Sequence, residues 1–118
     1  MVQIRYTESG NNRNLRVIGH ATSPQIDDGA IICSACSMLT YTLAQNVYDM
    51  AATGLVSINN IRLESGDAEL DFNVKNGHEA TVDIVINALF RGYELLENQY
   101  KKIFSITYQG WGEINFSL

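Results

Sequence analysis

With 118 residues, 46% of them hydrophobic and one of them proline, the chain has the size of a single compact domain, residues 1–118, with a sizeable core. Its formal net charge of -5 argues against direct binding of nucleic acid, because phosphate binding needs a basic surface. No apolar run approaches the ~20 residues of a membrane span and the first residues lack a signal-peptide pattern, so we expect a cytoplasmic protein without membrane contact.

The chain begins with a predicted β-hairpin. Apolar side chains alternate with polar ones in two segments, at Val2, Ile4 and Tyr6 and then at Leu15 and Val17. This alternation is typical of strands that bury one face, and the Ser-Gly-Asn-Asn sequence at 9–12 provides the turn. Residues 21–29 are polar and contain proline and glycine, so we expect a loop there that is too long for a tight turn.

A long amphipathic helix is predicted over residues 30–53. Its apolar positions are Ile32, Ala35, Cys36, Leu39, Leu43, Val47 and Met50. Intervals of three and four residues place these side chains on one face of the helix. Asp27 or Asp28 can cap its start, and Gly54 ends it.

Two strands, a second helix and a last strand complete the predicted elements. Residues 55–63 and 68–74 are predicted strands joined by a Ser-Gly-Asp turn, and 78–98 is a predicted helix. Residues 103–108 form a further strand, and the alternation over 113–118 allows a sixth. We therefore predict an α+β two-layer sandwich, in which a mixed, mostly antiparallel sheet of five or six strands carries two long helices on one face.

The residues that point to chemistry are a histidine and a cysteine. His20 ends the second predicted strand, and Cys33 follows near the predicted start of the first helix. A cysteine is nucleophilic as its thiolate, and a helix N-terminus or a nearby imidazole lowers the pKa of a thiol. Cys36 lies on the apolar stripe of the helix instead, so we expect it in the core. The pattern alone also allows structural roles for His20 and Cys33.

Two other thiol chemistries use the same residues. Cys33 and Cys36 form a C-x-x-C motif at a predicted helix start, as dithiol oxidoreductases do, although the aromatic-Cys-Gly-Pro surroundings of those enzymes are missing. A zinc site needs further ligands, and His20 and His78 are the only histidines. We therefore predict no metal and no cofactor.

The motif Gly19-His20-Ala21, followed after a loop by Ile31-Ile32-Cys33 and then by Ser37, resembles the signature of the ribosomal-processing cysteine proteases, the Prp family. The order of the predicted elements is similar over almost the whole chain. This resemblance implies that Cys33 is the nucleophile and His20 its general base. The supporting residues that it implies are Gly19, Ala21, Asp28 and Ser37. Residues 21–29 would be a lid that admits an extended peptide.

The resemblance also implies a function. Members of the family are homodimeric endopeptidases in ribosome biogenesis that remove a short N-terminal extension from the twenty-seventh protein of the large ribosomal subunit. Phage capsid or scaffold proteins are further substrates, and no metal or cofactor takes part. Backbone N–H groups at the helix start near Cys33 would stabilise the oxyanion. The acidic composition suits a basic ribosomal substrate.

Some positions depart from the family pattern. Ala30 stands where the family usually has aspartate, with Asp27 and Asp28 close by, and Thr22 replaces a common glycine. Residues 110–118 extend past the end of most members. Two alternative functions stay open beside the protease, namely a thiol-disulfide oxidoreductase that uses Cys33 and Cys36, and a noncatalytic binding or assembly protein on the same fold.

Overall fold

The computed structural model describes residues 2–19, 26–100 and 104–110. It does not describe the side chains of 26–30 and of most of 104–110. The alternating segments form its strands, and the two amphipathic segments form its helices. In chain order these elements are β1 (Val2–Ser9), β2 (Asn12–Ile18), α1 (Ile26–Ala52), β3 (Val56–Glu64), β4 (Asp67–Val74), α2 (Glu79–Gln99) and β5 (Phe104–Gly110).

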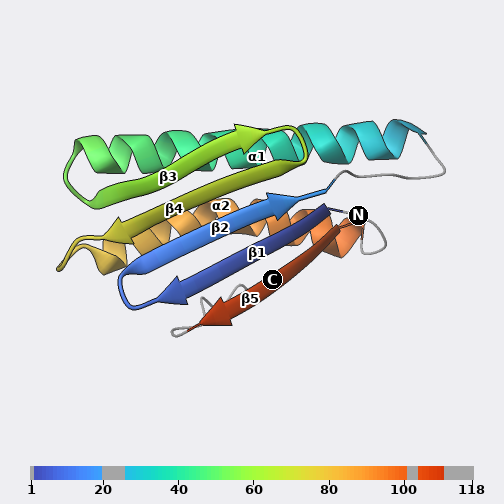
Figure 1. The fold of residues 1–118 in the computed structure, drawn as a ribbon. Coiled ribbons are helices and arrows are strands. Elements are labelled where there is room, and N and C mark those ends of the chain that lie inside the picture. Colours follow the sequence, from blue (N-terminus) through green and yellow to red (C-terminus); the bar gives the residue numbers. More distant parts are fainter. Residues whose placement is uncertain (1, 20–25, 101–103, 111–118) are drawn as a thin grey trace.

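The strands form one mixed sheet in the order β3-β4-β2-β1-β5. The pairs β1/β2, β2/β4 and β3/β4 are antiparallel, whereas β5 lies parallel to β1. Strands β4 and β5 run in the same direction, so the chain between them needs a crossover connection, and α2 provides it. Both helices lie on the same side of the sheet, behind it in Figure 1. The predicted two-layer α+β fold with a mostly antiparallel sheet is confirmed.

The core fills the space between the sheet and the two helices. Its strand residues are the alternating apolar ones, Val2, Ile4, Tyr6, Leu15, Leu70, Phe72 and Val74, together with Val56 of β3. Its helix residues are Ile32, Cys36, Leu43, Ala44, Val47 and Met50 from α1 and Val82, Ile86, Phe90 and Tyr93 from α2. The burial of alternate strand residues follows from the period of two of a β-strand, and the helical stripes follow from the period of 3.6.

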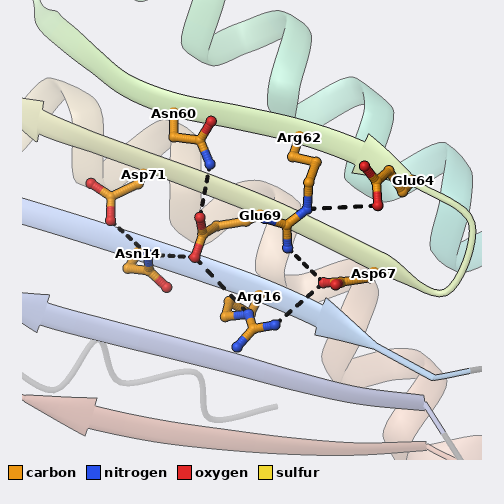
Figure 2. A network of polar contacts seen from close by, with 8 residues as sticks. All are labelled: Asn14, Arg16, Asn60, Arg62, Glu64, Asp67, Glu69 and Asp71. Carbon is orange, nitrogen blue, oxygen red and sulfur yellow. Dashed lines mark hydrogen bonds and ion pairs between the residues drawn. The ribbon is translucent and has the colours of Figure 1, made fainter.

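The other face of the sheet is polar, and neither of the two described helices lies on it. Figure 2 shows part of it, a network of asparagine, arginine and carboxylate side chains from β2, β3 and β4. At the end of the network nearest the β3–β4 turn, the Asp67 carboxylate accepts hydrogen bonds from Arg62 at 2.8 Å and from Arg16 at 3.3 Å. These contacts join three strands across the face, just outside the turn between β3 and β4.

Helix α1 starts earlier than predicted. It begins at Ile26 instead of residue 30, so Asp27 and Asp28 lie within its first turn and do not cap it. Carboxylates in the first turn interact favourably with the helix dipole. Gly29 costs only about 1 kcal/mol in a helix interior, which the packing of a long helix outweighs. The part of the predicted lid from Ile26 onward is therefore helical.

The other predicted boundaries agree with the structure to within two residues, including the start of α2 directly after His78. The predicted sixth strand, residues 113–118, lies outside the described residues. Across the described ranges, neither helix has a stretch that is long and apolar enough to cross a membrane.

Candidate active site

A cavity of about 220 Å³ lies between the first half of α1 and the end of the sheet at which β2 ends and β1 begins. Helix α1 contributes Cys33, Cys36, Ser37, Thr40 and Tyr41 to its walls. Opposite them lie Val2, Val17 and Gly19 of the hairpin and residues 63–68, which form the end of β3, the following turn and the start of β4. Two of the predicted supporting residues, Gly19 and Ser37, thus border the same cavity as Cys33.

Cys33 lies in α1, seven residues after the first residue of the helix. It is half-buried and not in a disulfide, and Ser37 follows one turn later at an exposed position. In a continuous helix the amide of Cys33 donates to the carbonyl of Gly29. We predicted that free N–H groups of a helix start beside Cys33 would stabilise the oxyanion. This prediction is wrong, because the helix starts two turns before Cys33. An oxyanion in the cavity needs donors from another segment.

Cys36 is a core residue, as predicted. Only 5% of it is exposed, and burial raises the pKa of its thiol to about 11, against a lowering contribution from Thr40. The Thr40 hydroxyl donates to the Cys36 carbonyl at 2.8 Å and lies 2.7 Å from the hydroxyl of Tyr93 on α2. Cys36 is therefore held in a hydrogen-bonded part of the core, and its thiol stays protonated at neutral pH.

The end of β2 is fixed beside the cavity. The N–H of Gly19 donates to the carbonyl of Gly66 at 2.9 Å, so the turn between β3 and β4 holds the residue that precedes His20. Gly19 has φ +97°, a backbone conformation that glycine adopts without steric cost. His20 and Ala21 lie outside the described residues, and so does the side chain of Asp28, whose backbone is in the first turn of α1. Their predicted roles stay predictions.

Replacing Gly19 by alanine is expected to impair activity more than stability. A side chain at this positive φ strains the backbone by about 1–2 kcal/mol and displaces the chain where it leads into His20. A displacement of about 1 Å at a catalytic group costs on the order of 10²-fold in rate. Gly10 in the β1–β2 turn has φ +57°, so Gly10→Ala is the matched control with similar strain at the far end of the hairpin.

The Gly19 prediction is checked by urea unfolding and by peptide cleavage with both variants. We expect both alanine variants to lose a similar amount of stability, whereas only Gly19→Ala loses cleavage activity. Equal cleavage by the two variants would contradict a role of this strand end in positioning His20.

One wall of the cavity was not predicted from the sequence. The Ser65-Gly66-Asp67 segment was predicted as a turn, but nothing in its sequence indicates that it meets Gly19 and faces Cys33. That contact depends on β4 pairing with β2, in a register that places Asp67 opposite Ile18. Among the described residues, no group of three histidine, cysteine, aspartate or glutamate side chains is placed to hold a metal ion.

One family model matches most of the chain. The family model described as Cysteine protease Prp matches residues 1–105, so the last residues of the chain lie beyond the match. No curated protein matches the sequence.

Several solved structures share the fold. The crystal structure of SMU.848 from Streptococcus mutans is 20% identical, with a TM-score of 0.60 over 93% of this chain and 96% of that chain. The essential ribosomal processing protease Prp from S. aureus is 12% identical. Its complex with a substrate peptide gives a TM-score of 0.65 over 92% and 99% of the two chains. Its complex with a covalently linked product peptide gives 0.62 over 93% and 99%.

Proposed function

The chain belongs to the Prp family of cysteine proteases, and from this premise we propose that it removes an N-terminal extension from the precursor of the twenty-seventh protein of the large ribosomal subunit. The observation that carries the proposal is the shared cavity of Cys33, Ser37 and Gly19. The chain segment that leads directly into His20 is fixed at this cavity by the Gly19–Gly66 hydrogen bond. The nucleophile and the start of the histidine segment therefore border one space.

The proposed mechanism uses a Cys33–His20 dyad. His20 takes the proton of the Cys33 thiol, and the thiolate attacks the carbonyl carbon of the scissile peptide bond. His20 then protonates the leaving amine, and water hydrolyses the acyl-enzyme with His20 acting again as base. Ser37 lies one helical turn after Cys33 at the same cavity, where its hydroxyl can support the histidine or contact the substrate. The complex of the S. aureus protease with a covalently linked product peptide supports a covalent intermediate.

The substrate is inferred from the family and from charge. The S. aureus protease is a ribosomal processing protease that has been captured with a substrate peptide. Ribosomal proteins are basic, and the net charge of -5 on this chain favours encounter with a basic partner. A phage capsid or scaffold protein with a similar extension is the second substrate class. We place the reaction in the cytoplasm, where ribosomal proteins are made.

The proposed function is tested with purified chain and purified precursor. We expect a single cut, identified by the new N-terminus of the shortened ribosomal protein, and no cut in a precursor made without the extension. If the precursor stays intact after prolonged incubation with the chain, while the thiol of Cys33 is kept reduced, the proposal is contradicted.

The alternative as a dithiol oxidoreductase has less support. Such an enzyme needs both thiols to reach a protein disulfide, and Cys36 is 5% exposed with a raised thiol pKa. A noncatalytic binding protein would leave the placement of Cys33 at the cavity without a role. No observation in the described part of the chain favours either alternative over the protease.

We also propose that the protein is a homodimer that pairs through an apolar stripe on α1. This α1 stripe consists of Ile31, Met38, Tyr41 and Tyr48, which are 55%, 67%, 54% and 48% exposed. Ile31 and Met38 are seven residues apart, and so are Tyr41 and Tyr48, an interval that recurs in helices that pair side by side. The sequence from Gly29 to Tyr48 contains no charged residue, which is unusual for a helix face in water.

Replacing Tyr48 by glutamate is expected to separate the dimer, because a carboxylate in an apolar contact costs several kcal/mol of desolvation. Tyr48 does not border the cavity, so the site itself stays unchanged. Ile84→Glu on α2 is the matched control, since Ile84 is 69% exposed and lies outside the stripe. Sedimentation velocity over a range of concentrations measures both variants. A dimer that survives Tyr48→Glu, or that Ile84→Glu separates equally, would contradict pairing through the α1 stripe.

A further inference from the structure

The buried thiol of Cys36 is not used by the proposed protease mechanism. It nevertheless borders the same cavity as Cys33 and lies three residues further along the same helix. The electrostatic influence of Cys33 reaches it, since Cys33 is one of the groups that raise the pKa of the Cys36 thiol, after burial. Two thiols, one half-buried and one buried, therefore lie next to each other at the wall of one cavity.

The spacing of the two residues is close to that of a disulfide. Side chains three residues apart on a helix have Cβ atoms about 5–6 Å apart, whereas a disulfide needs about 3.5–4.5 Å. The two Cβ atoms must therefore approach each other by about 1–2 Å before the bond can form, and both side chains border the cavity. A disulfide formed in this way is strained, and strained disulfides are readily reduced.

We propose that Cys33 and Cys36 form a reversible disulfide after a peroxide oxidises Cys33, so that Cys36 is a resolving thiol for the catalytic cysteine. This inference rests on the proposed function only in taking Cys33 as the reactive thiolate. In the first step the thiolate attacks hydrogen peroxide, the O–O bond breaks, and Cys33 becomes a sulfenic acid with release of hydroxide. In the second step the Cys36 sulfur attacks the Cys33 sulfur, and the hydroxyl group leaves with the thiol proton as water. Two glutathione molecules restore both thiols and leave as oxidised glutathione.

The burial of Cys36 sets the order of these steps. A thiol whose pKa is about 11 holds very little thiolate at neutral pH, so peroxide does not attack Cys36 first. The same property makes the second step slow and dependent on pH, because its rate follows the thiolate fraction of Cys36. Below that pKa the step should speed up about tenfold for each unit of pH. The disulfide prevents further oxidation of Cys33 to sulfinic acid, which is irreversible for an ordinary protein.

The test is intact-mass spectrometry of the reduced full chain after a small excess of hydrogen peroxide, without substrate. For the wild type we expect a loss of two hydrogen atoms, mapped by peptide analysis to a Cys33–Cys36 bond and reversed by glutathione. Cys36→Ala, which replaces the thiol by a small side chain, should instead show a sulfenic acid that dimedone traps and then a gain of two oxygen atoms at Cys33. Cys36→Ser is the second variant in case Cys36→Ala does not fold.

Several results would overturn the proposal. One is that Cys33 gains two oxygen atoms to the same extent in the wild type and in Cys36→Ala. Another is a disulfide that joins two chains instead of the two cysteines of one chain. A disulfide rate that does not change with pH would also contradict the assigned order. Because the readout is mass and uses no substrate, failure of the disulfide and failure of precursor cleavage are observed separately.

Discussion

Replacing Cys33 by alanine is expected to abolish cleavage of the ribosomal protein precursor, with kcat/KM falling by a factor on the order of 10⁴ or more. The reason is that the proposed reaction passes through a bond between the Cys33 sulfur and the substrate carbonyl, and a methyl group forms no such bond. Cys33 is half-buried, so the loss of one sulfur atom changes the packing little. The measurement is the rate of precursor shortening, with thermal unfolding of the variant as the check of its fold.

Cys36→Ala is the matched control for this prediction, because it removes a sulfur atom one helical turn away. Cys36 is buried in the core, and we expect its variant to lose some stability and to keep most of the cleavage activity. His20→Ala should resemble Cys33→Ala, since no base is then present to take the proton from the attacking thiol. Cleavage by Cys33→Ala at a rate near that of the wild type would exclude Cys33 as the nucleophile. Loss of cleavage in Cys36→Ala with a folded chain would show that the second thiol is also needed for the activity.

Replacing Arg13 by methionine is expected to lower the free energy of unfolding by about 3–5 kcal/mol, the usual cost of removing one partner of a buried ion pair. Arg13 is 5% exposed and Glu8 is 8% exposed. The Arg13 Nε atom lies 3.4 Å from Glu8 Oε1 and 3.5 Å from Asp83 Oδ1. Its Nη1 atom also donates to the carbonyl of Gly10 at 2.8 Å. Methionine fills similar space but leaves two carboxylates without their cation.

The pH dependence of the Arg13 variant identifies the cause. In the wild type, burial raises the pKa of Glu8 and Arg13 opposes this shift, so without Arg13 the pKa rises further. A raised carboxyl pKa means that the folded state binds the proton more tightly than the unfolded state. Ionised Glu8 therefore costs stability above its folded pKa, and this cost disappears as the pH falls through that pKa. The destabilisation should be full at neutral pH and smaller at mildly acidic pH.

Arg16→Met is the control for the loss of an arginine from the same strand. Arg16 lies on the open face, where its side chain is 38% exposed and its nearest carboxylate is Asp67 at 3.3 Å (Figure 2). Exposed ion pairs of this kind contribute about 1 kcal/mol or less. Urea unfolding at neutral and at mildly acidic pH measures the free energy of unfolding of both variants. A cost for Arg13→Met no larger than for Arg16→Met would show that the buried pair does not stabilise the fold.

The sequence by itself determined the elements and their order. Alternation at Val2, Ile4 and Tyr6, and the three- and four-residue spacing from Ile32 to Met50, predict which faces are buried, because both periods are local properties of the backbone. The same spacing separated Cys36 from Cys33 and assigned it to the core, where the structure places it. The predicted start of α1 was wrong. Gly29 and the polar residues before it are typical of a loop, but the helix includes them and begins at Ile26.

The tertiary structure alone decided what surrounds Cys33. The carbonyl of Gly66 holds Gly19 at the cavity, and this contact arises only when β4 pairs with β2, two strands that are far apart in the sequence. Such contacts depend on strand register and helix packing, which couple distant residues, and the local periods that predict single elements contain no information about them.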